Sequence, residues 1–117
     1  MRRMYQDLKV WQEGMNLVVL VYALVKQLPQ EEKYDLGSQM RRAAVSVPAN
    51  ISEGAGRSGE KEFLYFLSIA RGSLCELETL LLLCKKLNYT ESVSEEIDCL
   101  NKVYALLSGL MKSIKNK

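Results

Sequence analysis

The amino-acid sequence predicts an all-α protein: an antiparallel, up-down, left-handed four-helix bundle that occupies residues 1–117 as a single domain. Three observations predict this class. Apolar residues recur with helical spacing in four successive stretches, and the connections between these stretches are short. Of all residues, 48% are apolar, which is enough for a core in a domain of this length. Only two prolines and seven glycines interrupt the pattern.

The first helix is expected over residues 8–27, between the N-cap candidate Asp7 and the helix-breaking Pro29. Its apolar residues form two stripes: one is Leu8, Trp11, Met15, Val18, Tyr22 and Val25, and the other is Val10, Leu17, Val21, Leu24 and Leu28. Together they cover more than half of the helix surface, whereas a helix of a monomeric bundle needs a narrower apolar face. We therefore expect this helix to carry a second partner surface, with Trp11 as a core or interface anchor.

The second helix is expected over residues 31–55, ending at a glycine-rich turn that begins at Gly54. Pro48 lies inside it and removes the hydrogen bond to the carbonyl of Ala44. Two shorter helices are one possible outcome, and a single helix with a kink at Pro48 is the other. Because the apolar pattern keeps its phase across Pro48, we favour the kinked helix.

The third helix is expected over residues 59–87, after Ser58 as N-cap, and is apolar nearly all round. A helix of this kind is normally buried on all sides, which so small a bundle cannot achieve by itself. Leu64, Tyr65 and Leu82 lie outside the core stripe. We therefore expect them, with Trp11 of the first helix, to form contacts between subunits of a homo-oligomer.

The fourth helix is expected over residues 91–115, where Ser92-x-x-Glu95 matches a capping box. A heptad-like apolar stripe follows: Val93, Ile97, Leu100, Tyr104, Leu107, Met111 and Ile114.

The residue types that are missing argue against catalysis and metal binding. The sequence has no histidine and therefore no histidine general base, triad or metal ligand. Its three cysteines form no CxxC pair, which argues against a zinc site or a disulfide framework and favours reduced thiols. The glycines of residues 54–59 lack the lysine and hydroxyl side chain of a phosphate-binding P-loop. We expect no enzyme, no cofactor and no metal.

The charge pattern and the hydropathy predict a cytoplasmic protein without a membrane partner. The apolar run Leu17–Val25 is too short to span a bilayer, and no small-residue cleavage site follows it. The net charge is +2, spread evenly except for Arg2 and Arg3 at the N-terminus. A strong DNA-binding domain shows a basic stripe on one face, and no such stripe is obvious here.

A strip of polar residues follows one face of the second helix: Ser38, Gln39, Arg42, Ser46, Asn50, Glu53 and Arg57. In one interpretation it is a recognition surface, where Arg42 and Arg57 contact phosphates. Ser46 and Asn50 would then hydrogen-bond to the partner. In the interpretation that we favour, these residues pair with one another and with neighbouring helices, as the i,i+4 spacing of Glu53 and Arg57 indicates.

Arg41 and two pairs of lysines are further candidates for partner contact. Arg41 lies on a different face of the second helix, where an interface or solvated position is favoured over phosphate binding. Lys85 and Lys86 stand near the end of the third helix, and Lys112 and Lys115 near the end of the fourth. Singly, such lysines are solvated charges. In a ring they repeat with the symmetry and form a basic rim that attracts RNA.

Four motifs carry a resemblance to a known family: SQMRRAAVSVPANISEGAGR (Ser38–Arg57), DLKVWQ (Asp7–Gln12), KEFLYFL (Lys61–Leu67) and SLCELETLLLL (Ser73–Leu83). From about Asp7 to Lys115, the chain resembles the small bacterial four-helix-bundle proteins encoded inside intervening sequences of 23S ribosomal RNA genes. The resemblance implies an up-down bundle that assembles into a ring, a homopentamer. A related protein of diversity-generating retroelements resembles this fold and works as a nucleic-acid-binding partner of a reverse transcriptase, so the resemblance also suggests nucleic-acid binding.

Two functions follow from these patterns. The first is a non-enzymatic, nucleic-acid-associated binding module that acts on structured RNA or on an RNA–protein complex, as the family context favours. The alternative is a protein–protein scaffold or accessory subunit with no direct nucleic-acid contact, as the even charge balance favours. We rank the RNA-associated module first.

Overall fold

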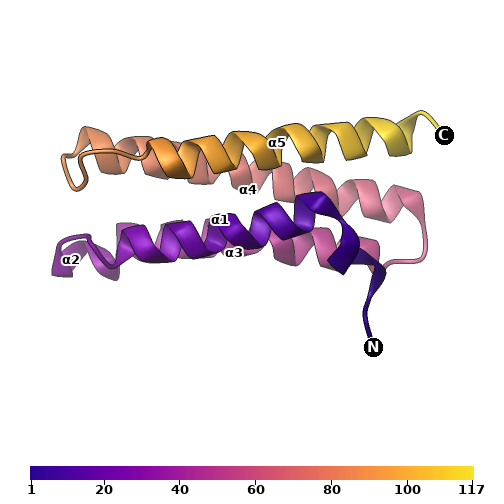
Figure 1. Cartoon of the computed structure of the whole chain (residues 1–117), viewed down its shortest axis with the longest axis horizontal. Coiled ribbons are helices and arrows are strands. Elements are labelled where there is room, and N and C mark those ends of the chain that lie inside the picture. The colour runs from indigo at the N-terminus through magenta and orange to yellow at the C-terminus, as the bar shows by residue number, and fades with distance from the viewer.

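The structure, a computed structural model, describes all residues 1–117 and contains helices but no strand (Figure 1). In chain order the elements are η1 (Met4–Asp7, a 3₁₀ turn), α1 (Lys9–Val25), α2 (Gln30–Lys33), α3 (Leu36–Ala55), α4 (Glu60–Lys86) and α5 (Ser94–Lys115). None of the helices combines the length and the hydropathy that a bilayer-crossing segment requires.

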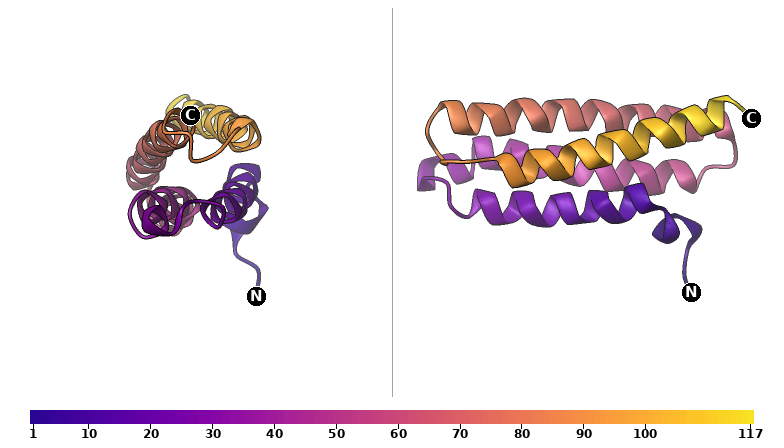
Figure 2. Two further views of the ribbon diagram at one scale, coloured as in Figure 1. Left: turned by 90° about the vertical axis from the view of Figure 1, so that its left-hand side faces the viewer. Right: turned by 45° about the horizontal axis from the view of Figure 1, so that its top comes forward.

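The four long helices run alternately up and down, and the bundle is 46 Å long (Figure 1). Figure 2 shows the bundle from one end: α1 contacts α3 and α5, and α4 also contacts α3 and α5. The diagonal pairs are therefore α1 with α4 and α3 with α5. The antiparallel four-helix bundle predicted from the sequence is confirmed, and both chain termini lie at the same end (Figure 1).

The core consists of 25 buried residues, all of them apolar, and no polar or charged residue is buried. Each long helix contributes side chains with no exposed surface, among them Leu17, Val47, Leu74 and Leu107. Burying a leucine or valine side chain contributes about 1.5–3 kcal/mol to folding. The helical periodicity of these apolar residues therefore accounts for the packing of the bundle.

Helix α3 continues through Pro48 as one element, so the alternative of two shorter helices is wrong. The ring of Pro48 is buried where α3 packs on α1, at Gly14. A Cβ atom at Gly14 would lie 3.7 Å from the Pro48 ring, which is ordinary van der Waals contact. A bend at Pro48 is expected because proline removes one helical hydrogen bond there. This bend stays a prediction.

The second long helix begins at Leu36 and not at residue 31. The short helix α2 comes first, and Asp35, with φ −116° and ψ −90°, turns the chain before α3. This corner lets Leu28 and Leu36 both enter the core. Gly37 allows the start of α3 to approach α1 closely, since a Cβ atom at this position would lie 2.8 Å from Cγ1 of Val25. The expectation of one helix over residues 31–55 missed this corner because its cause is a contact with α1.

The predicted cap of the first helix is wrong. Asp7 lies in the 3₁₀ turn η1, where its carboxylate accepts a hydrogen bond from Nε of Arg2 at 2.8 Å. Leu8 is the residue before α1, and no side chain caps that helix. An aspartate that is already paired with an arginine does not reach the free N–H groups of the next helix.

The caps of the third and fourth helices also differ from the prediction. Gly59, and not Ser58, precedes α4. Helix α5 begins at Ser94, where the hydroxyl of Ser92 accepts the backbone N–H of Ser94 at 3.2 Å. Ser92 therefore stabilises the turn before the helix. Serine forms such local hydrogen bonds in turns as readily as at helix caps.

Candidate functional site

The polar strip of α3 faces α4 and is used to join the two helices. The hydroxyls of Ser46 and Ser73 are 2.8 Å apart across the contact. The side-chain amide of Asn50 donates to the Ser46 carbonyl at 2.7 Å and to the Ser46 hydroxyl at 2.9 Å. All three residues are half-buried. Their hydrogen-bonding groups are already satisfied within the bundle, which agrees with the structural interpretation.

Arg57, the last residue of the strip, lies between two carboxylates and an aromatic ring. Its guanidinium pairs with Glu53 at 2.9 Å and with Glu62 at 3.9 Å. It also stands over the ring of Phe66, 4.9 Å from the centroid. These contacts neutralise the arginine charge and join α3 to α4, so Arg57 is poorly placed for a phosphate.

Arg41 is held at the corner where α2 meets α3. The guanidinium donates to the carbonyl of Lys33 and to the hydroxyl of Ser38, both at 3.1 Å. It also lies over the ring of Tyr22 in α1, 5.9 Å from the centroid. Through these three contacts the half-buried side chain of Arg41 connects α1, α2 and α3.

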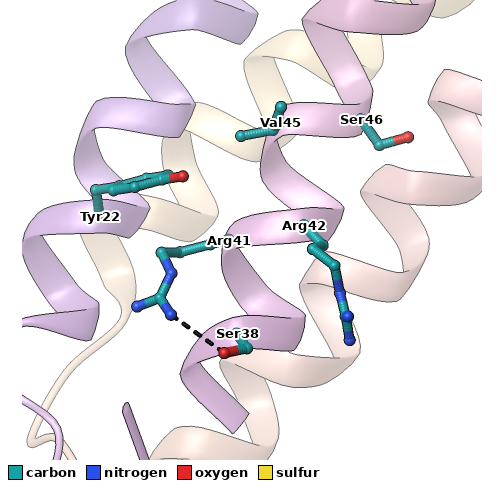
Figure 3. A pocket seen from close by; sticks show the side chains of 6 residues that line it. All are labelled: Tyr22, Ser38, Arg41, Arg42, Val45 and Ser46. Atoms are coloured by element: carbon teal, nitrogen blue, oxygen red, sulfur yellow. Dashed lines mark hydrogen bonds between the residues drawn. The ribbon is translucent and has the colours of Figure 1, made fainter. Parts of the chain in front are cut away.

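Arg42, the next residue after Arg41, is exposed and takes part in no ion pair. Figure 3 shows Arg41 and Arg42 leaving α3 on opposite sides of Ser38, with Arg41 turned toward Tyr22. They border an open hollow of about 510 Å³ that is lined by Tyr22, Ser38, Arg41, Arg42, Val45 and Ser46. The hollow has hydroxyl and guanidinium donors and no carboxylate, so its chemistry suits an anionic group.

The structure separates the two lysine pairs. Lys85 and Lys86 end α4, whereas Lys112 and Lys115 lie in the last turn of α5. Since α4 and α5 are antiparallel neighbours, the pairs stand at opposite ends of the 46 Å bundle (Figure 1). One continuous basic site that includes all four lysines is therefore impossible within one chain.

The two ends of the bundle differ in charge. Around Lys85 and Lys86 the acidic residues are Glu31 and Glu32 of α2, Asp35 before α3, Glu91 in the loop before α5, and Glu95 and Glu96 at the start of α5; the other basic residues at this end are Lys26 and Lys33. The opposite end collects the basic residues of both chain termini: Arg2, Arg3, Lys9, Lys112, Lys115 and Lys117. Acidic residues there are partly paired, Asp7 with Arg2 and Glu60 with Lys117. The end that holds the two termini is thus the more basic one.

The four predicted interface residues divide into two groups. Trp11 and Leu64 are half-buried and pack against the core, and Trp11 also meets the ring of Tyr5 edge-on at 5.4 Å. Tyr65 and Leu82 are 63% and 53% exposed on α4. Tyr65 and Leu82 therefore offer more free apolar surface to another molecule than Trp11 and Leu64 do.

An apolar surface between α1 and α3 extends the partner surface that the sequence predicted for the first helix. Met15, Tyr22 and Val45 line hollows along this side, and each is more than 40% exposed. The double apolar stripe of the first helix indicated a partner surface, but it did not show that Val45 of α3 continues it. Periodicity assigns residues to a face of one helix and leaves open which neighbour lies beside that face.

The three cysteines are free thiols at separate places. Cys99 is half-buried, and its thiol donates to the carbonyl of Glu13 at 3.8 Å. Burial raises the pKa of the Cys84 and Cys99 thiols above the ordinary value, and nearby carboxylates add to the shift. Such thiols are weakly nucleophilic. No three histidine, cysteine, aspartate or glutamate residues are grouped to hold a metal ion.

Comparison with known proteins places this fold in a family. A crystal structure from Bacteroides thetaiotaomicron, of a protein of unknown function from the S23 ribosomal protein family, is 23% identical in sequence. The match has a TM-score of 0.77 and covers 88% of this chain and 98% of that one, so the two share their fold. No curated protein matches the chain. The model of the 23S rRNA-intervening sequence protein family matches residues 6–113. The chain therefore belongs to the 23S rRNA-intervening sequence protein family.

Proposed function

We propose that this protein is a non-enzymatic, cytoplasmic, RNA-associated binding module that acts as a homo-oligomeric ring. One observation carries the proposal: both chain termini lie at the same end of the bundle (Figure 1), and the terminal segments are rich in basic residues. Lys112 and Lys115 are exposed and take part in no ion pair. Free cationic side chains of this kind bind phosphates and release counterions.

Assembly into a ring would multiply this modest charge. The resemblance of the chain to its family implies a homopentamer. In any ring with one rotation axis, the basic ends of all subunits point the same way. Each subunit then adds the same lysines to one rim, which raises the local potential well above that of a single chain. The description of the family, which refers to an intervening sequence of 23S rRNA, makes RNA the preferred partner.

Charge reversal at the two ends of the bundle tests this proposal. The double variant Lys112→Glu/Lys115→Glu alters the basic end, and Lys85→Glu/Lys86→Glu is its matched control at the opposite end. All four side chains are exposed, so both variants are expected to fold. RNA affinity is measured by fluorescence anisotropy over a range of salt concentrations, and RNA retention by crosslinking in native cells and denaturing purification.

The basic end predicts a difference between the two variants. Loss of two phosphate contacts lowers the slope of log affinity against log salt by about 1.5–2, and only the first variant should show this loss. Equal losses in both variants would indicate unspecific charge attraction. Recovery of no more RNA with the wild type than with an acidic protein of the same size would contradict RNA association.

A protein–protein scaffold is the second candidate, favoured by the exposed apolar residues along α1 and α3. Met15, Tyr22 and Val45 offer an apolar surface that another protein can bury. This function predicts a protein partner that stays bound in high salt, with no nucleic acid in the complex. A pull-down with nuclease treatment and a salt wash distinguishes the two functions.

A further inference from the structure

A small open hollow lies at the corner where α1, α2 and α3 meet. Its volume is about 280 Å³, and its walls are Tyr22, Val25, Lys26, Lys33, Tyr34 and Arg41. The first two belong to the last turn of α1, Lys33 ends α2, and Arg41 lies in the second turn of α3. The fold therefore brings three cationic side chains and two tyrosine rings to one place.

The positive charge of this hollow is not neutralised by the rest of the chain. None of its three cationic side chains takes part in an ion pair, and no acidic side chain lines its walls. In α2, Glu32 instead accepts a hydrogen bond from the hydroxyl of Tyr89 at 3.3 Å. Since neighbouring cations repel one another, the hollow suits an anion that carries more than one negative charge.

Arg41 is held in position without a ligand. Its Nη2 atom donates both of the hydrogen bonds that fix the side chain, to the carbonyl of Lys33 and to the hydroxyl of Ser38. Figure 3 shows its guanidinium turned toward Tyr22. The Nε and Nη1 groups keep their hydrogen atoms for another acceptor, and a guanidinium binds phosphate oxygens in this way. A side chain that is already ordered loses little entropy when it binds.

The two tyrosines of the hollow offer flat aromatic surface. Tyr34 is 75% exposed and takes part in no aromatic or cation–π pair within the chain. Tyr22 is 43% exposed, and the Arg41 guanidinium lies 5.9 Å from its ring centroid. Nucleobases stack on exposed aromatic rings whatever the identity of the base. The hollow thus combines a site for an anion with a site for a planar ring.

We infer that this hollow binds a nucleoside 5′-monophosphate, with the phosphate between Lys26, Lys33 and Arg41 and the base on Tyr34. A phosphate monoester carries between one and two negative charges at neutral pH and three acceptor oxygens. A phosphate inside an RNA strand carries only one charge. Three cations therefore favour a terminal phosphate. The volume lies near the lower limit of small-molecule sites, about 300 Å³, which fits a single nucleotide.

This site is separate from the basic end of the proposed RNA surface. Lys112 and Lys115 lie at the end of the bundle that holds both termini, and α2 lies at the opposite end (Figure 1). The inference therefore goes beyond the proposed function and does not depend on it. A nucleoside 5′-monophosphate can be a free nucleotide or the 5′-phosphorylated end of an RNA, and the experiment below distinguishes these two sources.

Isothermal titration calorimetry of the full chain measures binding of adenosine 5′-monophosphate (AMP). Adenosine and inorganic phosphate are titrated as the two halves of this probe. Circular dichroism verifies that every variant is folded. The variants are Tyr34→Ala and Lys26→Gln/Lys33→Gln, and their matched controls are Tyr104→Ala and Lys85→Gln/Lys86→Gln. The control residues are exposed and do not line the hollow, and the control lysines lie at the same end of the bundle.

We expect one AMP to bind per chain, at least about tenfold more tightly than adenosine or inorganic phosphate. Tyr34→Ala should weaken AMP binding at least about fivefold and leave phosphate binding unchanged, because it removes only the stacking surface. Lys26→Gln/Lys33→Gln should weaken AMP and phosphate alike, by at least about tenfold. Both controls should bind AMP as the wild type does.

Three results would overturn the inference: a wild type that does not bind AMP, a Tyr34→Ala variant that binds AMP with wild-type affinity, or equal losses in the two lysine variants. The last would indicate charge attraction by the whole end of the bundle. None of them bears on RNA association through Lys112 and Lys115, which the salt dependence of those variants measures separately.

An adenylate trinucleotide, with and without a 5′-phosphate, distinguishes the two sources of the ligand. Tighter binding of the phosphorylated trinucleotide than of AMP identifies the ligand as the end of an RNA, and weaker binding identifies it as a free nucleotide. Equal binding of the trinucleotide with and without its 5′-phosphate would contradict recognition of a terminal phosphate and overturn the inference.

Discussion

Replacing Gly54 with alanine tests how closely α3 and α4 approach each other. Gly54 is buried, and a Cβ atom there would lie 2.7 Å from Cβ of Phe66 and 3.0 Å from Cδ1 of Phe63. Cβ of Phe66 is fixed to the backbone of α4, so the helices must move apart. Overpacking of this kind costs about 1–3 kcal/mol, while the better helix propensity of alanine returns up to about 1 kcal/mol.

The expected result is a net loss of about 1–2 kcal/mol in the free energy of unfolding, or about 4–8 °C in Tm. Gly109→Ala is the matched control, because Gly109 is exposed inside α5 and a Cβ atom there meets nothing within 4 Å. That variant should gain about 0.5–1 kcal/mol from helix propensity alone. Thermal and urea unfolding, followed by far-UV circular dichroism, measure both. If Gly54→Ala unfolds at or above the wild-type temperature, the close approach of the helices is refuted.

Three further predictions concern the interior. Ser46→Ala should lose about 1 kcal/mol of stability, and the double variant with Ser73→Ala should lose less than the sum of the two single losses in a urea-unfolding cycle. Leu77→Ala, with no exposed surface at the site, should lose about 2–5 kcal/mol; a loss below about 1 kcal/mol would contradict a close-packed core. Burial raises the pKa of the Cys84 thiol, and Glu96 raises it further. The contribution of Cys84 to the free energy of unfolding is therefore constant below the ordinary thiol pKa and declines as the pH rises through the higher pKa of the folded state. Cys84→Ala should flatten that alkaline decline in urea unfolding, and iodoacetamide should label exposed Cys75 long before Cys84.

The sequence predicted the polar strip and favoured a structural role for it, because the spacing of its residues along one helix is local. The i,i+4 relation of Glu53 and Arg57 is visible in the sequence, and the structure contains that ion pair at 2.9 Å. The second partner of Arg57, Glu62, belongs to the next helix and was not predictable from spacing. The same reason explains why Ser73 was missed as the partner of Ser46.

The helix ends were the weakest part of the prediction. Asp7, Ser58 and Ser92 all have the side chain of a good N-cap, yet none caps its long helix. A cap contributes only about 1 kcal/mol, so a competing contact such as the Arg2–Asp7 pair decides whether it forms. The corner at Asp35 depends likewise on the packing of Gly37 against Val25.

The sequence by itself determined that this protein is a bundle of four long helices with an apolar core, because a periodic apolar stripe can be buried only against other helices. The tertiary structure decided which residues meet. Antiparallel packing carried Lys85 and Lys86 to one end of the bundle and Lys112 and Lys115 to the other (Figure 1). It also placed α1 beside α3, so that residues of both helices line one open hollow. Periodicity acts over a few residues of one helix, whereas charge and partner surfaces depend on distances between helices that are far apart in the chain.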